Sequence, residues 1–274
     1  MPQSLAGLAA SPAVGISVWV LAALVLAAFV AGWVDSVVGG GGLIQLPALV
    51  IALPADASTP EILGTNKLSS VAGTLVATLT YLRTIRVPVG MVLPLVVAAF
   101  AGSAAGSSVA RFIPKDLLTP VVLVAVVAVG AYTYLKPTLG RVHEERHSGW
   151  SRAWRSGLIG VVIGFYDGVL GPGTGSFFVI AIVAFLGFGF LQGTVAAKLA
   201  NLTTNLASIL VFGIHGEVLW VLGGCMAIAN LAGGFIGAKM AMRHGNEFIR
   251  TVFLVVIGVL AIKLAWDTVA QWTG

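Results

Sequence analysis

Two stretches of sequence decide the fold: residues 32–42 read GWVDSVVGGGG, and residues 164–175 read GFYDGVLGPGTG. In each stretch an aspartate is followed, four residues later, by a glycine-rich segment that interrupts an apolar run. In a helix interior, glycine costs about 1 kcal/mol and proline about 3 kcal/mol relative to alanine. We therefore expect each stretch to hold the end of one helix, a break, and the start of another.

The two stretches belong to a longer internal repeat. Asp35 matches Asp167 at an offset of 132 residues, and Lys67 matches Lys198 at an offset of 131. The offset of 131 also relates two ladders of small residues, which we interpret as helix-packing faces: Ala98, Gly102, Gly106 and Ala110 match Ala229, Gly233, Gly237 and Ala241. These matches predict a duplicated unit of about five membrane segments. The predicted division is an N-terminal repeat over 1–136, a charged linker over 137–155 and a C-terminal repeat over 156–274.

The composition is that of an integral membrane protein. The 274 residues are 58% hydrophobic and 9% charged, with a mean hydropathy of +1.02. A soluble domain carries about 25% charged residues, so the composition excludes a soluble globule, a disordered chain and a nucleic-acid binder. A membrane-spanning helix needs about 20 apolar residues. We predict an all-α, polytopic helix bundle from ten apolar segments, at 16–34, 43–53, 61–82, 87–110, 117–135, 157–170, 175–191, 193–214, 217–241 and 248–266.

The number of crossings in each repeat determines how the two repeats relate to one another. An odd number makes the second copy enter the membrane the opposite way up, which gives an inverted repeat of the transporter type. Re-entrant hairpins at the glycine breaks would preserve this parity, whereas a single broken crossing would make the repeats parallel. The sequence leaves this choice open. With the charged linker in the cytoplasm, the basic loops near Arg83 and Arg243 fall on that same side, as the positive-inside rule favours.

The glycine breaks are candidate anion sites. A helix that restarts after a break presents unpaired N–H groups and the positive end of its dipole, both of which suit an anion. The alternative interpretation is a tight turn outside the membrane. The candidate binding positions are Gly40, Gly41, Gly42, Gly173, Thr174 and Gly175.

Two helices carry a lysine within a polar stripe. In the first copy Lys67, Ser70 and Thr74 lie at i, i+3 and i+7, on one helix face, and Asn66 widens the stripe. In the second copy the same positions hold Lys198, Asn201 and Asn205. We predict that both stripes bind substrate in a central cavity. The alternative is that each lysine snorkels to the membrane surface, since each lies near the start of its segment.

The paired aspartates Asp35 and Asp167 have two functional interpretations. They orient the lysines as ion pairs, or they carry protons, because a membrane carboxylate is usually paired or protonated. The structural alternative is that each caps a broken helix end. Sequence motifs for ATP hydrolysis, metalloprotease or serine hydrolase chemistry do not occur, and the four histidines lack metal-ligand spacing. We therefore expect a protein that is not an enzyme and holds no cofactor and no metal.

At these residues the sequence resembles the TauE/SafE sulfite-exporter family, and within it the YfcA-type branch. The likeness covers nearly the whole chain from about residue 16. Its N-terminal part is the stretch at 32–42 with TNKL at 65–68, and its C-terminal part is GFYDGVLGPGTGSF at 164–177 with AKLAN at 197–201. The resemblance implies a bacterial inner-membrane location and secondary transport of small sulfur-containing anions such as sulfite or organosulfonates.

The favoured hypothesis is a secondary transporter, an exporter, that works by alternating access about a central anion site between the repeats. A passive anion channel is an alternative. An intramembrane aspartyl hydrolase using Asp35 and Asp167 is a weaker one, because Tyr166-Asp167 resembles a YD motif but the GxGD partner is absent. The expected partners are a small anion and the lipid bilayer, with no nucleic acid; homo-oligomerisation stays open.

Overall fold

The computed structural model describes residues 17–54, 56–112, 135 and 146–273, and every element in these ranges is a helix. The expected segment at 117–135 lies outside the described residues apart from Leu135, as does most of the predicted linker. The elements are α2 (Val18–Val38), α3 (Gly42–Ala52), α4 (Thr59–Leu82), α5 (Val89–Val109), η1 (Ala110–Phe112), α7 (Gly149–Val169), α8 (Thr174–Ala181), η2 (Ile182–Leu186), α9 (Phe190–Ile214) and α10 (Trp220–Thr273).

Local signals in the sequence set several helix ends. Ser17 caps α2 by accepting a hydrogen bond from the Val20 amide at 3.3 Å. Helix α2 ends at Gly39, which takes the left-handed conformation with a φ of 82°, a region in which glycine carries no steric cost. Helix α4 begins with a capping box between Ser58 and Glu61, which satisfies two amides that the helix itself leaves unbonded.

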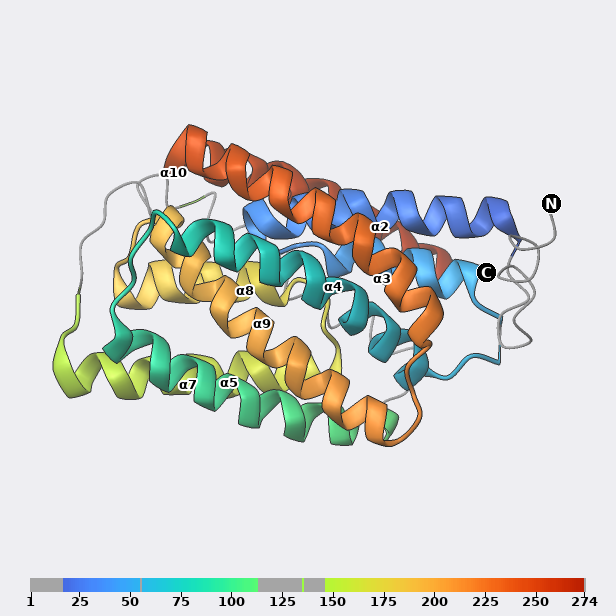
Figure 1. Ribbon diagram of the computed structural model, residues 1–274, viewed down its shortest axis with the longest axis horizontal. Helices are drawn as coiled ribbons and strands as arrows, with labels where there is room; N and C mark the ends of the chain where they lie inside the picture. The colour runs from blue at the N-terminus through green and yellow to red at the C-terminus, as the bar shows by residue number, and fades with distance from the viewer. Residues whose placement is uncertain (1–16, 55, 113–134, 136–145, 274) are drawn as a thin grey trace.

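Corresponding helices of the two halves run in opposite directions. In Figure 1, α2 and α4 run from the right of the picture to the left, whereas α7 and α9 run from left to right. Helix α5 and the first part of α10 are likewise opposed (Figure 1). The connection at 83–88, the start of α7 and the bend at Gly245 lie at one end of the bundle, and the connections at 53–58 and 215–219 lie at the other (Figure 1).

The main packing partners come from opposite halves of the chain. Helix α5 packs along α7, α10 packs along α2 and α4, and α9 contacts both α4 and α5. Glycines of the two ladders allow the first two contacts, because a methyl group on Gly102 would overlap the backbone of Val161, and one on Gly233 would overlap the backbone of Phe29. The predicted role of these ladders in packing is confirmed at both positions.

Two helix boundaries differ from the expected ones. Helix α7 begins at Gly149, inside the stretch expected as a linker, so that Trp150 and Trp154 form exposed parts of its first turns. The segment expected at 175–191 ends at Gly187, after the short π-helix η2. The segments expected at 217–241 and 248–266, by contrast, agree with the two helices within α10 that meet at a kink at Gly245, where φ is 73° and ψ is −159°.

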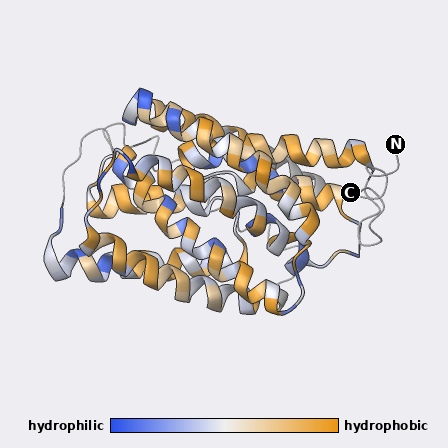
Figure 2. Cartoon of the chain, in the orientation of Figure 1, coloured by the Kyte–Doolittle hydropathy of each residue, from blue (hydrophilic) through white to orange (hydrophobic). Residues whose placement is uncertain are grey.

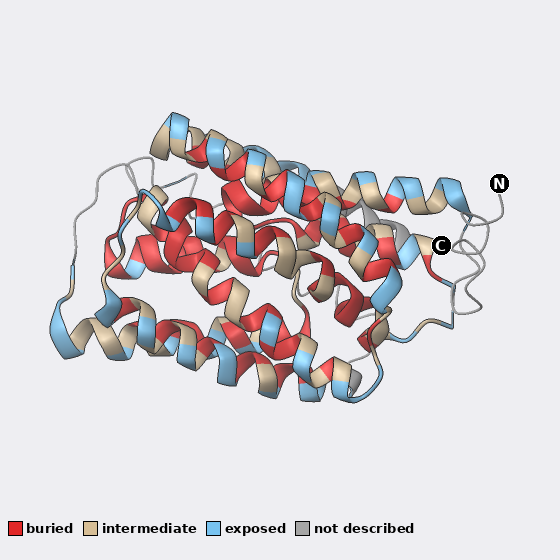
Figure 3. Cartoon of the chain, in the orientation of Figure 1, coloured by how far each residue is buried: buried red, intermediate tan, exposed pale blue. Residues whose placement is uncertain are grey.

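The outside of the bundle is apolar and the polar groups lie within it. Figure 2 shows hydrophobic residues along the outer faces of the helices, and Figure 3 shows the buried residues concentrated between them. Four described helices are long and apolar enough to cross a membrane: Val18–Val38, Val89–Val109, Phe190–Ile214 and Trp220–Val256. Helices α3 and α8 have 11 and 8 residues, fewer than the roughly 20 that a crossing requires. An apolar exterior of this kind suits lipid.

Candidate functional site

The two glycine breaks touch each other in the middle of the molecule. A methyl group on Gly39 would overlap the backbone of Gly175, and one on Gly175 would lie 2.5 Å from the Gly39 Cα atom. The Ser176 amide donates to the Gly39 carbonyl at 3.2 Å, and its hydroxyl donates to the Val38 carbonyl at 2.8 Å. The breaks are therefore buried and mutually bonded, and they are not turns at the protein surface.

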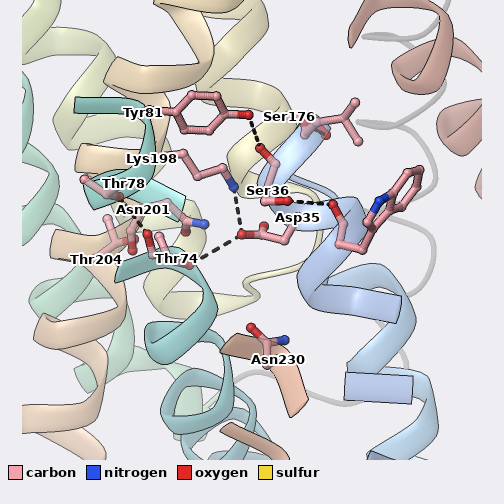
Figure 4. A network of polar contacts seen from close by, with 12 residues as sticks. Asp35, Ser36, Thr74, Thr78, Tyr81, Ser176, Lys198, Asn201, Thr204 and Asn230 are labelled. Atoms are coloured by element: carbon pink, nitrogen blue, oxygen red, sulfur yellow. Dashed lines mark hydrogen bonds and ion pairs between the residues drawn. The ribbon is translucent and has the colours of Figure 1, made fainter. Parts of the chain in front are cut away.

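Each lysine pairs with the aspartate of the other half. Lys67 Nζ, on α4, lies 2.6 Å from Asp167 Oδ2, on α7. Lys198 Nζ, on α9, lies 2.7 Å from Asp35 Oδ2, on α2. Figure 4 shows Lys198 and Asp35 pointing at one another, with the Thr74 hydroxyl directed at the same carboxylate oxygen as the lysine. The two ion pairs thus join the halves of the chain across their interface.

Both lysines are buried, at 2% exposure for Lys67 and 0% for Lys198. Neither reaches the membrane surface, so the snorkelling alternative is wrong. Removing one partner of such a pair leaves an uncompensated buried charge, which costs about 3–5 kcal/mol. The placement agrees with the prediction that the aspartates orient the lysines, while their part in transport stays a prediction.

A polar cavity lies between the ion pairs and the breaks. Its lining includes ten of the residues predicted from the sequence, from both halves: Asp35, Gly42, Asn66, Lys67, Ser70, Asp167, Thr174, Gly175, Asn201 and Asn205. Gly39 and Gly171, which were not singled out as binding residues, also line it. Lys67 reaches the second break, since a methyl group on Gly171 would lie 3.4 Å from Lys67 Nζ.

The other predicted binding residues lie outside the cavity lining. Lys198 and Thr74 are directed at Asp35 instead, with the Thr74 hydroxyl donating to the carboxylate at 3.4 Å. Gly40, Gly41 and Gly173 shape the breaks without lining the cavity. The Thr174 and Ser176 amides already donate to carbonyls of the two breaks, so the start of α8 offers fewer free N–H groups than expected.

Several buried polar contacts around the site were not predicted. Tyr81 donates to the Ser36 carbonyl at 2.8 Å, and Tyr166 donates to the Pro172 carbonyl at 2.8 Å, so each tyrosine ties a helix to a break region. Gln45 accepts from Asn230 Nδ2 at 3.1 Å. In the sequence, the one indication that Gln45 belongs to the site is that it is an isolated amide side chain within an otherwise apolar helix.

The two aspartates of the site pair with lysines and not with each other. Each aspartate forms an ion pair with a lysine, and this is not the shared-proton dyad that an aspartyl hydrolase needs. Within the described part of the chain, no cluster of three or more His, Cys, Asp or Glu side chains suits a metal ion. The cavity is lined by one ammonium group, by amide and hydroxyl groups, and by the two carboxylates.

The fold and the site together define a multi-pass helical membrane protein whose interior holds two crossed ion pairs where two broken helices meet. The chain belongs to the sulfite exporter TauE/SafE family, whose model matches residues 24–264.

Relatives with similar sequences are described as membrane transporters. The chain is 38% identical to "Probable membrane transporter protein ORF9" of Sinorhizobium sp, over 90% of this chain and 93% of that protein. It is 33% identical to "Probable membrane transporter protein YfcA" of Escherichia coli K12, over 94% and 96% of the two chains. It is 35% identical to a "Probable membrane transporter protein" of Haemophilus influenzae, over 92% and 97%. No solved structure gives a significant match to this chain.

Proposed function

We propose that this protein is a secondary transporter that exports small sulfur-containing anions, such as sulfite or organosulfonates, across the bacterial inner membrane. The family description and the transporter names of the relatives support transport of this kind. Transport moves the anion without converting it, so the site requires no cofactor and no metal.

The observation that carries the proposal is the cavity where Lys67, from one half, meets the second glycine break, from the other. A small oxyanion has several acceptor atoms, and ammonium and amide groups bond such atoms strongly. Ser70, Asn201 and Asn205 add donors from α4 and α9. A pocket between the two halves is also where transporters built from repeats bind their substrates.

Alternating access in this proposal is a rocking of one inverted repeat against the other. The opposed directions of corresponding helices support an inverted relation. The two ion pairs between the halves also support an inverted relation, because the repeat offsets relate Lys67–Asp167 to Lys198–Asp35. The basic end of the bundle, which carries Arg83 and Arg243, faces the cytoplasm in this proposal. Helices α3 and α8 are then broken or re-entrant parts of the site.

The test is ligand-induced thermal stabilisation of the purified protein by sulfite, thiosulfate, sulfate, sulfoacetate and taurine. A ligand that binds the folded state alone raises the melting temperature. We expect at least one sulfur anion to do so for the wild type and for Lys239→Met, which removes an exposed lysine, but not for Lys67→Met. Equal stabilisation in Lys67→Met would remove this lysine from the site. In proteoliposomes, flux that rises linearly without saturation would indicate a channel instead of a carrier.

A further inference from the structure

The two ion pairs differ in how completely their carboxylates are bonded. Asp35 accepts from Lys198 at 2.7 Å and from Thr74 at 3.4 Å. Among the described residues, the side chain of Asp167 has a single partner, the ion pair with Lys67 at 2.6 Å, and its Oδ2 atom accepts no hydrogen bond. Asn205 occupies the repeat position of Thr74, and its side-chain amide donates to nothing. The Lys198–Asp35 pair is therefore stabilised by a second donor, Thr74, whereas the Lys67–Asp167 pair has no second donor among the described residues.

The cavity has the same asymmetry. Lys67 lines it and Lys198 does not. Asn205 also lines it, although only 2% of this residue is exposed and its Nδ2 atom is unpartnered. A buried donor without a partner costs about 1–3 kcal/mol. This cost points to a ligand in the cavity that accepts a hydrogen bond from Asn205.

The charges in the site leave no excess positive charge for an anion. The two lysines and the two aspartates sum to zero, and both Asp35 and Asp167 line the cavity. Among the elements that pack against α7, α5, α8 and η2 contribute no ionisable side chain, and α9 contributes Lys198, which pairs with Asp35. The neighbouring Tyr166 donates to the Pro172 carbonyl. An added anion would therefore be an uncompensated buried charge, which is costly.

We propose that Asp167 takes up one proton when the anion binds, and that this proton releases Lys67 to the anion. The Asp167 carboxylate becomes a carboxylic acid, and Lys67 keeps its charge and donates to an anion oxygen. Asn205 donates a second bond. The Lys198–Asp35 pair stays closed throughout. This inference rests on the proposed function and makes the transport proton-linked, with the proton and the anion leaving together.

The experiment measures proton uptake on anion binding by titration calorimetry in buffers of different ionisation enthalpy. The probe is isethionate, a sulfonate that stays ionised from mildly acidic to neutral pH. We expect the wild type to take up about one proton per anion bound. D167N should bind isethionate with no proton uptake. D35N/K198Q, which neutralises the other pair, should still take up about one proton, although its affinity falls.

The single variant D167N leaves Lys67 without its ion-pair partner and could fail to fold. Double variants that neutralise both members of one ion pair avoid this problem and test the same assignment. K67Q/D167N leaves no lone buried charge, and we expect it to bind no isethionate, in contrast to D35N/K198Q. Proton uptake that persists in D167N, or that disappears in D35N/K198Q, would overturn the assignment to Asp167. Anion binding by the wild type without proton uptake would overturn this inference and leave the proposed function standing. A wild type that binds neither isethionate nor any of the five anions tested above would overturn both.

Discussion

Breaking the Lys198–Asp35 pair from either side is expected to destabilise the protein by different amounts. Lys198 is fully buried and Asp35 is its one partner among the described residues, so Asp35→Leu leaves a lone ammonium group. Its cost falls near the upper end of the range of about 3–5 kcal/mol for breaking a buried pair. Lys198→Met leaves a carboxylate that keeps Thr74 and is partly exposed, so its cost falls near the lower end.

The double variant distinguishes a direct ion pair from two independent effects. D35L/K198M removes both charges and leaves no lone ion, so it should cost less than either single variant. Independent effects would instead add, to about 8 kcal/mol. The measurement is unfolding by sodium dodecyl sulfate in mixed micelles, followed by tryptophan fluorescence. Additive costs, to within about 0.5 kcal/mol, would refute the reasoning from this pair.

Two other predictions concern packing and topology. Gly102→Leu should prevent stable folding, because its side chain would overlap the backbone of α7. Gly224→Ala should fold and melt no lower than the wild type, because nothing lies within 4 Å of the added methyl group and alanine is the better helix former. The yield of monodisperse protein and its melting temperature check both. In a Cys225→Ser background, a membrane-impermeant thiol reagent applied to right-side-out vesicles should label His215→Cys and leave Thr84→Cys unlabelled. Both positions are exposed, and the α9–α10 and α4–α5 connections that contain them lie at opposite ends of the bundle (Figure 1). The reverse pattern would show that the basic end is external.

The helical class and most of the site residues could be predicted from the sequence. The apolar runs indicated helices, the glycine segments indicated the breaks, and the spacing of Lys67, Ser70 and Thr74 indicated a common helix face. Helical periodicity determines which residues share a face. It does not determine which distant helix that face meets, so the exchange of partners between Lys67–Asp167 and Lys198–Asp35 required the structure.

The contact between Gln45 and Asn230 was missed for a different reason. Matching the two halves draws attention to residues that recur, and these two do not recur, because the repeat positions hold Phe177 and Ala99.

The exchanged ion pairs have a consequence for the biogenesis of the protein. During synthesis, Lys67 and Asp35 enter the bilayer well before Asp167 and Lys198 have been translated. Until then, the nascent first half carries two ionisable groups whose counterparts do not yet exist, and a buried ion without a partner is costly. Lateral release of that half into lipid should therefore wait for the second half, so a chain truncated after the first repeat is expected to be retained at the insertion machinery or degraded.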